Sequence, residues 1–276
     1  MMVGLNAIAS LVAIPLTIDD LKDVLALQVK HKIIIGKGSN IFLKKDNYDE
    51  NYLFIVCDHV NTLVIKDNEM IVDCGTSLHQ LAWTSCAHQI GGYEFCEDIP
   101  GTLGGALIMN AGQYEFTISQ YVQWVDVYDL ESLSVKRIIP DEHFFGYRSS
   151  SFNSNQVILR ASLKVQTAKQ EDILQKIFNY KKNRYAKQPL EFANAGSVFK
   201  RPQKDGDVLY VWKLLEDCGL RAYRINDAMI SDKHPGFIVN LGNASPSDIA
   251  SIINLCQQKV KEKYDVKLEL EWKVIE

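Results

Sequence analysis

The 276-residue sequence lacks several features that would each indicate a particular class of protein. Its apolar runs fall well short of the ~20 residues that span a bilayer. The first residues carry no basic segment ahead of an apolar one, as a secretory signal does. There is no basic surplus either, because 30 Lys and Arg stand against 34 Asp and Glu. We therefore expect a soluble, cytoplasmic protein that binds neither membranes nor nucleic acid.

Metal-binding patterns are also missing. The six cysteines form no CxxC pair, and no histidine stands beside them at a metal-ligand spacing. We therefore expect no metal site, and we expect reduced thiols with a structural role, as in cytosolic proteins. The length of the chain allows more than one domain and a sizeable buried core.

The first half of the sequence predicts short strands separated by glycine-rich turns. A β-branched run at 32–35 ends at a glycine, and residues 78–89 have helical spacing. The segments 122–130 and 134–139 predict a hairpin. Residues 157–167 alternate apolar and polar side chains, as a half-buried strand does.

The second half is richer in helical patterns. Residues 170–182 carry one apolar stripe, and a helix is predicted around 210–218. The sequence Ser245-Pro246-Ser247-Asp248 combines an N-cap, a proline at the first helical position and a capping-box acid. Residues 268–275 alternate as a final strand. Together, the predicted strands and helices indicate an α+β fold with a boundary between two domains near residue 167.

Two glycine clusters stand out from this background. The first is Gly36-Lys37-Gly38-Ser39-Asn40; the second is Ile99-Pro100-Gly101-Thr102-Leu103-Gly104-Gly105-Ala106, followed by Asn110-Ala111-Gly112. Such turns let backbone N–H groups face a phosphate, so a dinucleotide pyrophosphate is the natural ligand. The spacing is neither that of a Rossmann fingerprint nor that of a P-loop. Simple tight turns remain an equal alternative on this pattern alone.

Taken in order, these segments resemble the UDP-N-acetylenolpyruvoylglucosamine reductase (MurB) family. The short interval between Arg148 and Ser197 is similar to that of the family's shorter type. The resemblance continues through Tyr147-Arg148-x-Ser150, Arg184-x-x-Lys187-x-Pro189, Gly196-Ser197-Val198-Phe199-Lys200-Arg201-Pro202, Lys233-His234-x-Gly236-Phe237-Ile238-Val239-Asn240 and a final strand with Glu271.

The resemblance implies a fold and an activity. It implies an FAD-binding domain of the vanillyl-alcohol-oxidase/PCMH type at 1–166, with lobes at 1–56 and 57–166. A smaller α+β substrate-binding domain follows at 167–276. The implied enzyme is a monomeric FAD-dependent oxidoreductase of peptidoglycan precursor synthesis and cell wall biogenesis. It would use NADPH to reduce UDP-N-acetylglucosamine enolpyruvate, a nucleotide sugar, to UDP-N-acetylmuramate.

The resemblance also implies residue roles. Arg148 and Glu271 would stabilise the enolate that develops on the substrate carboxylate, and Ser197 would donate the proton. Without the resemblance, these three fit a surface or salt-bridged arginine, an exposed acid on the polar face of an edge strand and a turn serine. The implied FAD contacts are Gly36, Gly38, Ser39, Asn40, Pro100, Gly101, Thr102, Gly104, Gly105, Asn110 and Gly112. The implied substrate contacts are Tyr147, Arg184, Lys187, Lys200 and Arg201.

Two segments depart from the family pattern and keep other functions open. The family's early Thr- and Gly-rich segment is replaced by Val3-Gly4-Leu5-Asn6, at a short N-terminus. Asn226-Asp227 stands where the family has a Gly-Gly pair, and an acid facing the phosphates of a nucleotide sugar would be unfavourable. The alternatives are a PCMH-type FAD oxidoreductase with another substrate and a non-catalytic paralogue that binds nucleotide sugars.

Overall fold

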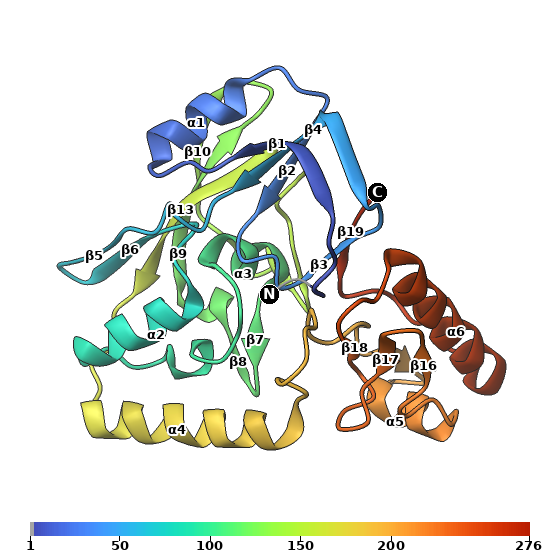
Figure 1. Cartoon of the computed structure of the whole chain (residues 1–276). Helices are drawn as coiled ribbons and strands as arrows, with labels where there is room; N and C mark the ends of the chain where they lie inside the picture. The colour runs from blue at the N-terminus through green and yellow to red at the C-terminus, as the bar shows by residue number, and fades with distance from the viewer. Residues whose placement is uncertain (1–2) are drawn as a thin grey trace. The chain divides into compact units, whose positions relative to one another are not determined.

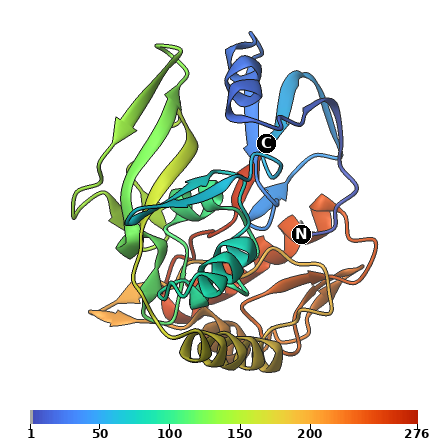
Figure 2. The ribbon, with the colours of Figure 1, turned by 90° about the vertical axis from the view of Figure 1, so that its left-hand side faces the viewer.

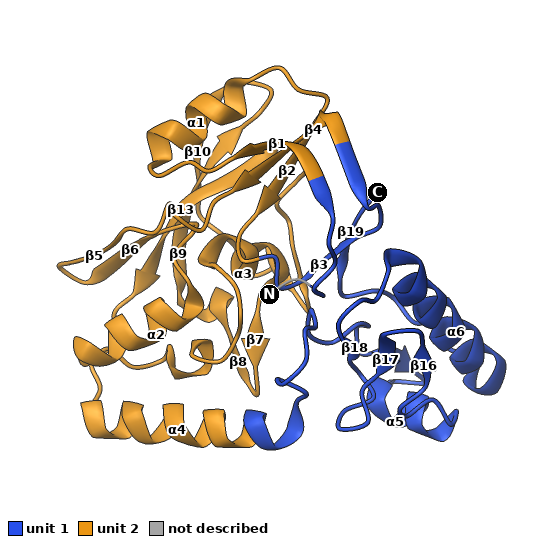
Figure 3. Cartoon of the chain, in the orientation of Figure 1, with its two compact units in different colours: residues 1–8, 38–48, 184–276 blue, residues 9–37, 49–183 orange. Residues whose placement is uncertain are grey.

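A computed structural model describes residues 3–276 and divides the chain into two compact units (Figure 3). Unit 1 comprises residues 1–8, 38–48 and 184–276, and unit 2 comprises residues 9–37 and 49–183. Unit 1 therefore takes two short pieces from the first fifty residues. This division follows compactness alone, so the functional domains expected at 1–166 and 167–276 stay a prediction.

Two sheets form the framework of unit 2 (Figure 1). In the order β1-β4-β2, the first contains β1 (Ile8–Ala13), β4 (Asn47–Val56) and β2 (His31–Ile35). In it β2 pairs in parallel with β4, from His31 opposite Tyr52 to Ile35 opposite Val56. The second is antiparallel, in the order β10-β9-β13-β6-β5: β10 (Ser134–Ile138), β9 (Val122–Asp129), β13 (Gln156–Lys164), β6 (Glu69–Asp73) and β5 (Leu63–Lys66).

Most helices of unit 2 pack on one core drawn from both sheets, whereas the helix at 170–187 buries Ile173 and Ile177 in a smaller cluster with Cys86. Thr17 caps α1 with a capping box, which fixes where that helix begins. The helices are α1 (Ile18–Ala26), α2 (Leu78–Ala87), the 3-10 turns η1 (Glu94–Cys96) and η2 (Ile118–Tyr121), α3 (Leu103–Met109) and α4 (Gln170–Lys187), whose last four residues belong to unit 1. Two small hairpins complete the unit: β7 (Gly112–Gln113) with β8 (Phe116–Thr117), and β11 (Phe145–Gly146) with β12 (Ser149–Ser150).

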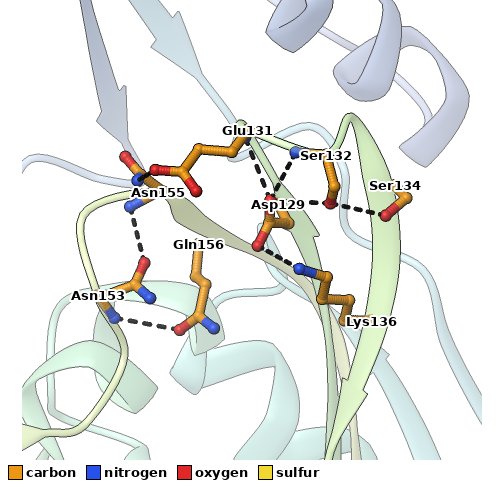
Figure 4. A network of polar contacts seen from close by, with 8 residues as sticks. All are labelled: Asp129, Glu131, Ser132, Ser134, Lys136, Asn153, Asn155 and Gln156. Atoms are coloured by element: carbon orange, nitrogen blue, oxygen red, sulfur yellow. Dashed lines mark hydrogen bonds and ion pairs between the residues drawn. The ribbon is translucent and has the colours of Figure 1, made fainter.

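The predicted hairpin at 122–139 is confirmed as β9 and β10, the light green strands that run side by side in Figure 2. Asp129 organises its turn (Figure 4). Its Oδ1 accepts from the backbone N–H groups of Glu131 and Ser132, and its Oδ2 accepts from Lys136 Nζ at 2.7 Å. The Lys136 contact and these hydrogen bonds hold the pKa of Asp129 well below its usual range. A local carboxylate thus fixes the register of the hairpin.

Unit 1 has its own core around one long helix. Ser245 caps α6 (Pro246–Tyr264) with the predicted capping box, and the apolar side chains behind the cap, such as Ile249 and Ile252, are buried. In this unit β3 (Ile41–Leu43) pairs in parallel with β19 (Lys273–Ile275). The remaining elements are β14 (Gln203–Lys204), β15 (Asp207–Val208), α5 (Val211–Asp217), β16 (Arg224–Ile225), β17 (Ala228–Ile230) and β18 (Ile238–Asn240).

The α+β class and the existence of the predicted helices and strands are confirmed, with two corrections. The strand predicted at 157–167 ends at Lys164, and it is buried nearly throughout instead of half-buried, since Ser162 is as fully buried as Leu163. The final strand covers residues 273–275, whereas the alternation predicts 268–275. Leu268 and Trp272 do share a buried side, but Leu270 makes only an isolated bridge to Phe199, so the first half is no regular ladder. All six cysteines are free, and five are buried. Among residues 3–276, no helix has the length and apolar character of a membrane span.

Candidate flavin and substrate site

In unit 2 the two glycine loops approach each other closely. Thr102 is buried, and a Cβ added to Gly36 would lie 2.2 Å from its Oγ1. No real Cβ tolerates that distance, so the protein's own packing requires glycine at position 36. The ends of β2 and of the segment before α3 are therefore adjacent.

Backbone hydrogen bonds hold the second loop in place. Gly104 N–H donates to Cys74 O at 2.8 Å, and Leu103 N–H donates to Thr76 O at 2.9 Å. Leu78 N–H donates to Gly101 O at 3.1 Å, and Thr102 forms an antiparallel bridge with Ser77. The loop at 101–104 is thus fixed by the end of β6 and the start of α2.

Gly105 has a different environment from Gly36. It lies in α3 and is exposed, and an added Cβ would meet only Thr102 Oγ1, at 3.9 Å. A glycine within a helix costs roughly 0.5–1 kcal/mol relative to alanine. The packing of the protein gives no reason for that cost, whereas the close approach of a ligand would.

The end of α3 is joined to the β11–β12 hairpin of the same unit. Asn110 has a left-handed backbone, with φ 43°, and its Nδ2 donates to Gly146 O at 3.0 Å. Ser150 Oγ donates to Ile108 O at 2.8 Å. Arg148 Nη2 donates to Gly112 O at 3.1 Å, and its guanidinium carbon lies 5.4 Å from the centre of the Tyr147 ring. Arg148, Tyr147, Asn110 and Gly112 are therefore brought together.

In unit 1 the structure brings together Ser197, Glu271 and Asn40. Glu271 N–H donates to Val198 O at 2.8 Å, and Lys200 N–H donates to Glu269 O at 2.9 Å. Asn40 Nδ2 donates to Glu271 O at 3.0 Å. Ser197 is exposed, whereas Val198 and Phe199 are buried. The backbones at 197–200 and 269–271 thus run alongside each other, next to the first glycine segment.

The basic residues assigned to the substrate occupy two short segments of unit 1. Arg184 is half-buried and Lys187 is exposed, at the end of α4. Lys200 is half-buried, and the guanidinium of exposed Arg201 lies 5.2 Å from the centre of the Tyr210 ring. These positions leave all four residues accessible, and their contact with a diphosphate stays a prediction.

The Asn226-Asp227 departure has a structural explanation. The two residues form the turn between β16 and β17, and Asn226 has a left-handed backbone with φ 48°, which asparagine tolerates well. Asn226 Nδ2 donates to Asp248 Oδ1 at 2.8 Å. Asp227 accepts from Arg224 Nη2 at 2.7 Å and from the Asn243 N–H at 3.0 Å. The charge of Asp227 is thus compensated within unit 1.

Asn194 orients the segment that carries Ser197, but the sequence analysis did not predict it as a site residue. Its Oδ1 accepts from the Gly196 N–H at 3.0 Å, and its Nδ2 donates to Phe192 O and Pro189 O at 2.8 and 3.1 Å. Asn194 is buried, so this network is protected from water. The pattern Asn-x-Gly ahead of Ser197 is the signal that could have indicated it, since asparagine caps such turns.

Comparison with known proteins identifies the family. Residues 188–275 match the model of the UDP-N-acetylenolpyruvoylglucosamine reductase C-terminal domain, and residues 9–132 match an FAD binding domain. A UDP-N-acetylenolpyruvoylglucosamine reductase of Thermotoga petrophila is 41% identical over 86% of this chain and 82% of its own. One from Caldanaerobacter subterraneus is 34% identical over 97% of this chain and 87% of its own. The chain belongs to the UDP-N-acetylenolpyruvoylglucosamine reductase (MurB) family.

The structural comparison agrees. The crystal structure of UDP-N-acetylenolpyruvylglucosamine reductase from Thermus caldophilus matches with a TM-score of 0.79 and 29% identity, covering 96% of this chain and 92% of that one. The family resemblance and the PCMH-type FAD fold expected from the sequence are thereby confirmed. This MurB-family protein is an FAD-dependent oxidoreductase.

The residues of unit 2 fit FAD. The open surface over Gly105 is one that a Cβ would occupy, and backbone hydrogen bonds hold the neighbouring loop in place. Within unit 2, Gly36, Pro100, Gly101, Thr102, Gly104, Gly105, Asn110 and Gly112 would hold the cofactor; within unit 1, Gly38, Ser39 and Asn40 would do so. These assignments stay predictions.

Proposed function

We propose that this protein reduces UDP-N-acetylglucosamine enolpyruvate to UDP-N-acetylmuramate with NADPH as the hydride donor, as a step of peptidoglycan precursor synthesis. The observation that carries the proposal is the arrangement in unit 1. The direct hydrogen bond from Glu271 N–H to Val198 O fixes Glu271 and Ser197 on neighbouring backbones. Membership of the family and the names of its relatives support the choice of substrate.

Bound FAD supplies hydride transfer in this reaction. The protein must then manage one negative charge and one proton, because hydride addition to the β-carbon of the enolpyruvyl group leaves an enolate at the carboxylate. Arg148 suits that carboxylate, since its planar guanidinium can bind both oxygens. Glu271, in its protonated form, donates a hydrogen bond to the same developing charge.

Ser197 donates the proton to the α-carbon and so completes the reduction. A serine hydroxyl is a weak acid in water, so its contribution depends on being held close to the accepting carbon. The backbone on both sides of Ser197 is fixed, while its side chain is exposed. This combination gives a hydroxyl that is accessible to a ligand and has little freedom to move away.

An anaerobic absorbance experiment tests the proposal. We expect the flavin bands of the purified protein to bleach with NADPH and to recover when UDP-N-acetylglucosamine enolpyruvate is added. The Ser197→Ala variant should bleach normally but recover roughly 10²–10⁴-fold more slowly, since general acid catalysis is worth that much. Bleaching without recovery in the wild type would instead indicate an FAD oxidoreductase with another acceptor.

A further inference from the structure

The Ser197 segment is held on two sides within unit 1. On one side lies Glu271, as described above. On the other lies the loop at 231–237: Ser197 forms an antiparallel bridge with Phe237, and Val198 N–H donates to Gly236 O at 3.0 Å. The position of Ser197 therefore depends on how firmly that loop is fixed.

Hydrogen bonds inside the loop fix it. The hydroxyl of buried Ser231 accepts from the backbone N–H groups of Lys233 and His234, both at 3.1 Å. Ser231 N–H donates to Phe237 O at 2.9 Å, and Phe237 N–H donates to His234 O at 3.0 Å. These contacts close the loop from Ser231 to Phe237 into a compact turn.

The imidazole of His234 is the contact that reaches Gly236. Its Nδ1 accepts from the Gly236 N–H at 3.1 Å, and its ring packs edge-on against Phe237, with centroids 4.9 Å apart and planes at 77°. Gly236 is thus held by its N–H to His234 and by its carbonyl to Val198. Only Gly236 lies between the ring of His234 and the backbone that carries Ser197.

We propose that His234 is a positioning residue that holds the Ser197 hydroxyl in place through Gly236. This inference rests on the proposed role of Ser197 as the proton donor. A ring that accepts at Nδ1 must carry its hydrogen on Nε2 and be neutral, because a protonated imidazole has no acceptor. His234 acts on the geometry of the donor and does not touch the reacting atoms.

The surroundings of His234 favour the neutral ring. Burial lowers its pKa below the ordinary value and outweighs a backbone hydrogen bond that raises it, and the positive charge of Arg221 lowers it as well. Phe237 and the backbone of its own loop occupy the sides of the ring described above. The Nδ1 acceptor is therefore present at neutral pH and is lost as the solution becomes acidic.

Two variants separate the hydrogen bond from the shape of the ring. His234→Phe keeps an aromatic ring against Phe237 but removes the acceptor. His234→Asn keeps an acceptor, since an asparagine side chain accepts from the N–H two residues on, but it cannot titrate. We expect His234→Phe to slow recovery of the flavin bands roughly 10–100-fold, the scale of a misplaced catalytic group. Its FAD content and NADPH bleaching rate should match the wild type, and His234→Asn should recover within about threefold of the wild-type rate.

Further readouts distinguish positioning from general damage. In a Ser197→Ala background, His234→Phe should have no further effect on recovery, because coupled residues do not add. The recovery rate of the wild type should fall at acidic pH, and that of His234→Asn should not fall there. Equal slowing of both half-reactions by His234→Phe, or an undiminished effect in the Ser197→Ala background, would overturn the inference.

Amide hydrogen exchange keeps the test independent of the reaction. In the holoprotein, His234→Phe should raise the exchange rates of the Gly236 and Val198 amides, and His234→Asn should not. The wild-type flavin bands could fail to recover with the enolpyruvyl sugar while amide exchange in His234→Phe rises as expected. The proposed function would then be wrong, but the positioning of Ser197 by His234 would still hold. Unchanged exchange rates of both amides in His234→Phe would refute the positioning role of His234.

Discussion

Gly105→Ala should make the protein more stable and weaken its binding of FAD. Gly105 lies in α3, and an added Cβ would meet nothing closer than Thr102 Oγ1 at 3.9 Å. The substitution therefore causes no clash and gains helix propensity, about 0.5–1 kcal/mol. For a protein of this size that corresponds to a rise in the melting temperature of roughly 1–4 °C. If FAD approaches α3 here, the same methyl group occupies space that the cofactor needs.

Two measurements on the same variant test this reasoning. Thermal unfolding of the apoprotein should show the gain in stability, and titration of the apoprotein with FAD should show a dissociation constant raised about tenfold or more, equivalent to ~1.4 kcal/mol. An unchanged FAD affinity would refute the assignment of Gly105 to the cofactor. A loss of apoprotein stability would refute the account of its environment.

Three other perturbations follow from contacts inside the units. Gly36→Ala should cost about 1–3 kcal/mol of stability through overpacking, because its Cβ would lie 2.2 Å from Thr102 Oγ1; adding Thr102→Ala should recover part of that cost in urea unfolding. Burial raises the pKa of Asp126, but hydrogen bonds from Arg137 and Arg160 outweigh it and leave the pKa below 3.8. The contribution of Asp126 to stability is therefore present above pH 3.8 and lost below it, and Asp126→Asn should cost about 1–2 kcal/mol at pH 7. Because the pKa of His234 is lowered in the folded protein, the unfolded chain binds more protons than the folded one below pH 6.5. The free energy of unfolding should therefore fall as the pH drops below 6.5, and it should fall less in His234→Asn.

Local signals made part of the fold predictable. The start of α6 could be placed because Ser245, Pro246 and Asp248 are neighbours in the chain, and they make the capping box that their order predicts. The β9–β10 hairpin likewise depends on Asp129 and residues close to it. Each of these features is decided by contacts within a few residues, which a sequence displays directly.

The site itself depends on contacts that no local pattern displays. Asn40 and Glu271 are 231 positions apart, yet the amide of one donates to the carbonyl of the other. The family resemblance supplied the identities of Ser197, Glu271 and Asn40 but not the backbone that joins them. The predicted final strand was too long for the same reason: alternation shows which side is buried, but regular pairing depends on where β3 lies.

The candidate catalytic residues of unit 1 are placed chiefly by backbone hydrogen bonds. The Ser197 segment is bonded through Val198 N–H on one side and Val198 O on the other. A side chain held in this way can change without dismantling its support, whereas Asn194 and His234 are side chains that form the support. Substitutions at Ser197 therefore report on chemistry and those at Asn194 or His234 on geometry, so the separation of the two half-reactions can assign each residue to one role.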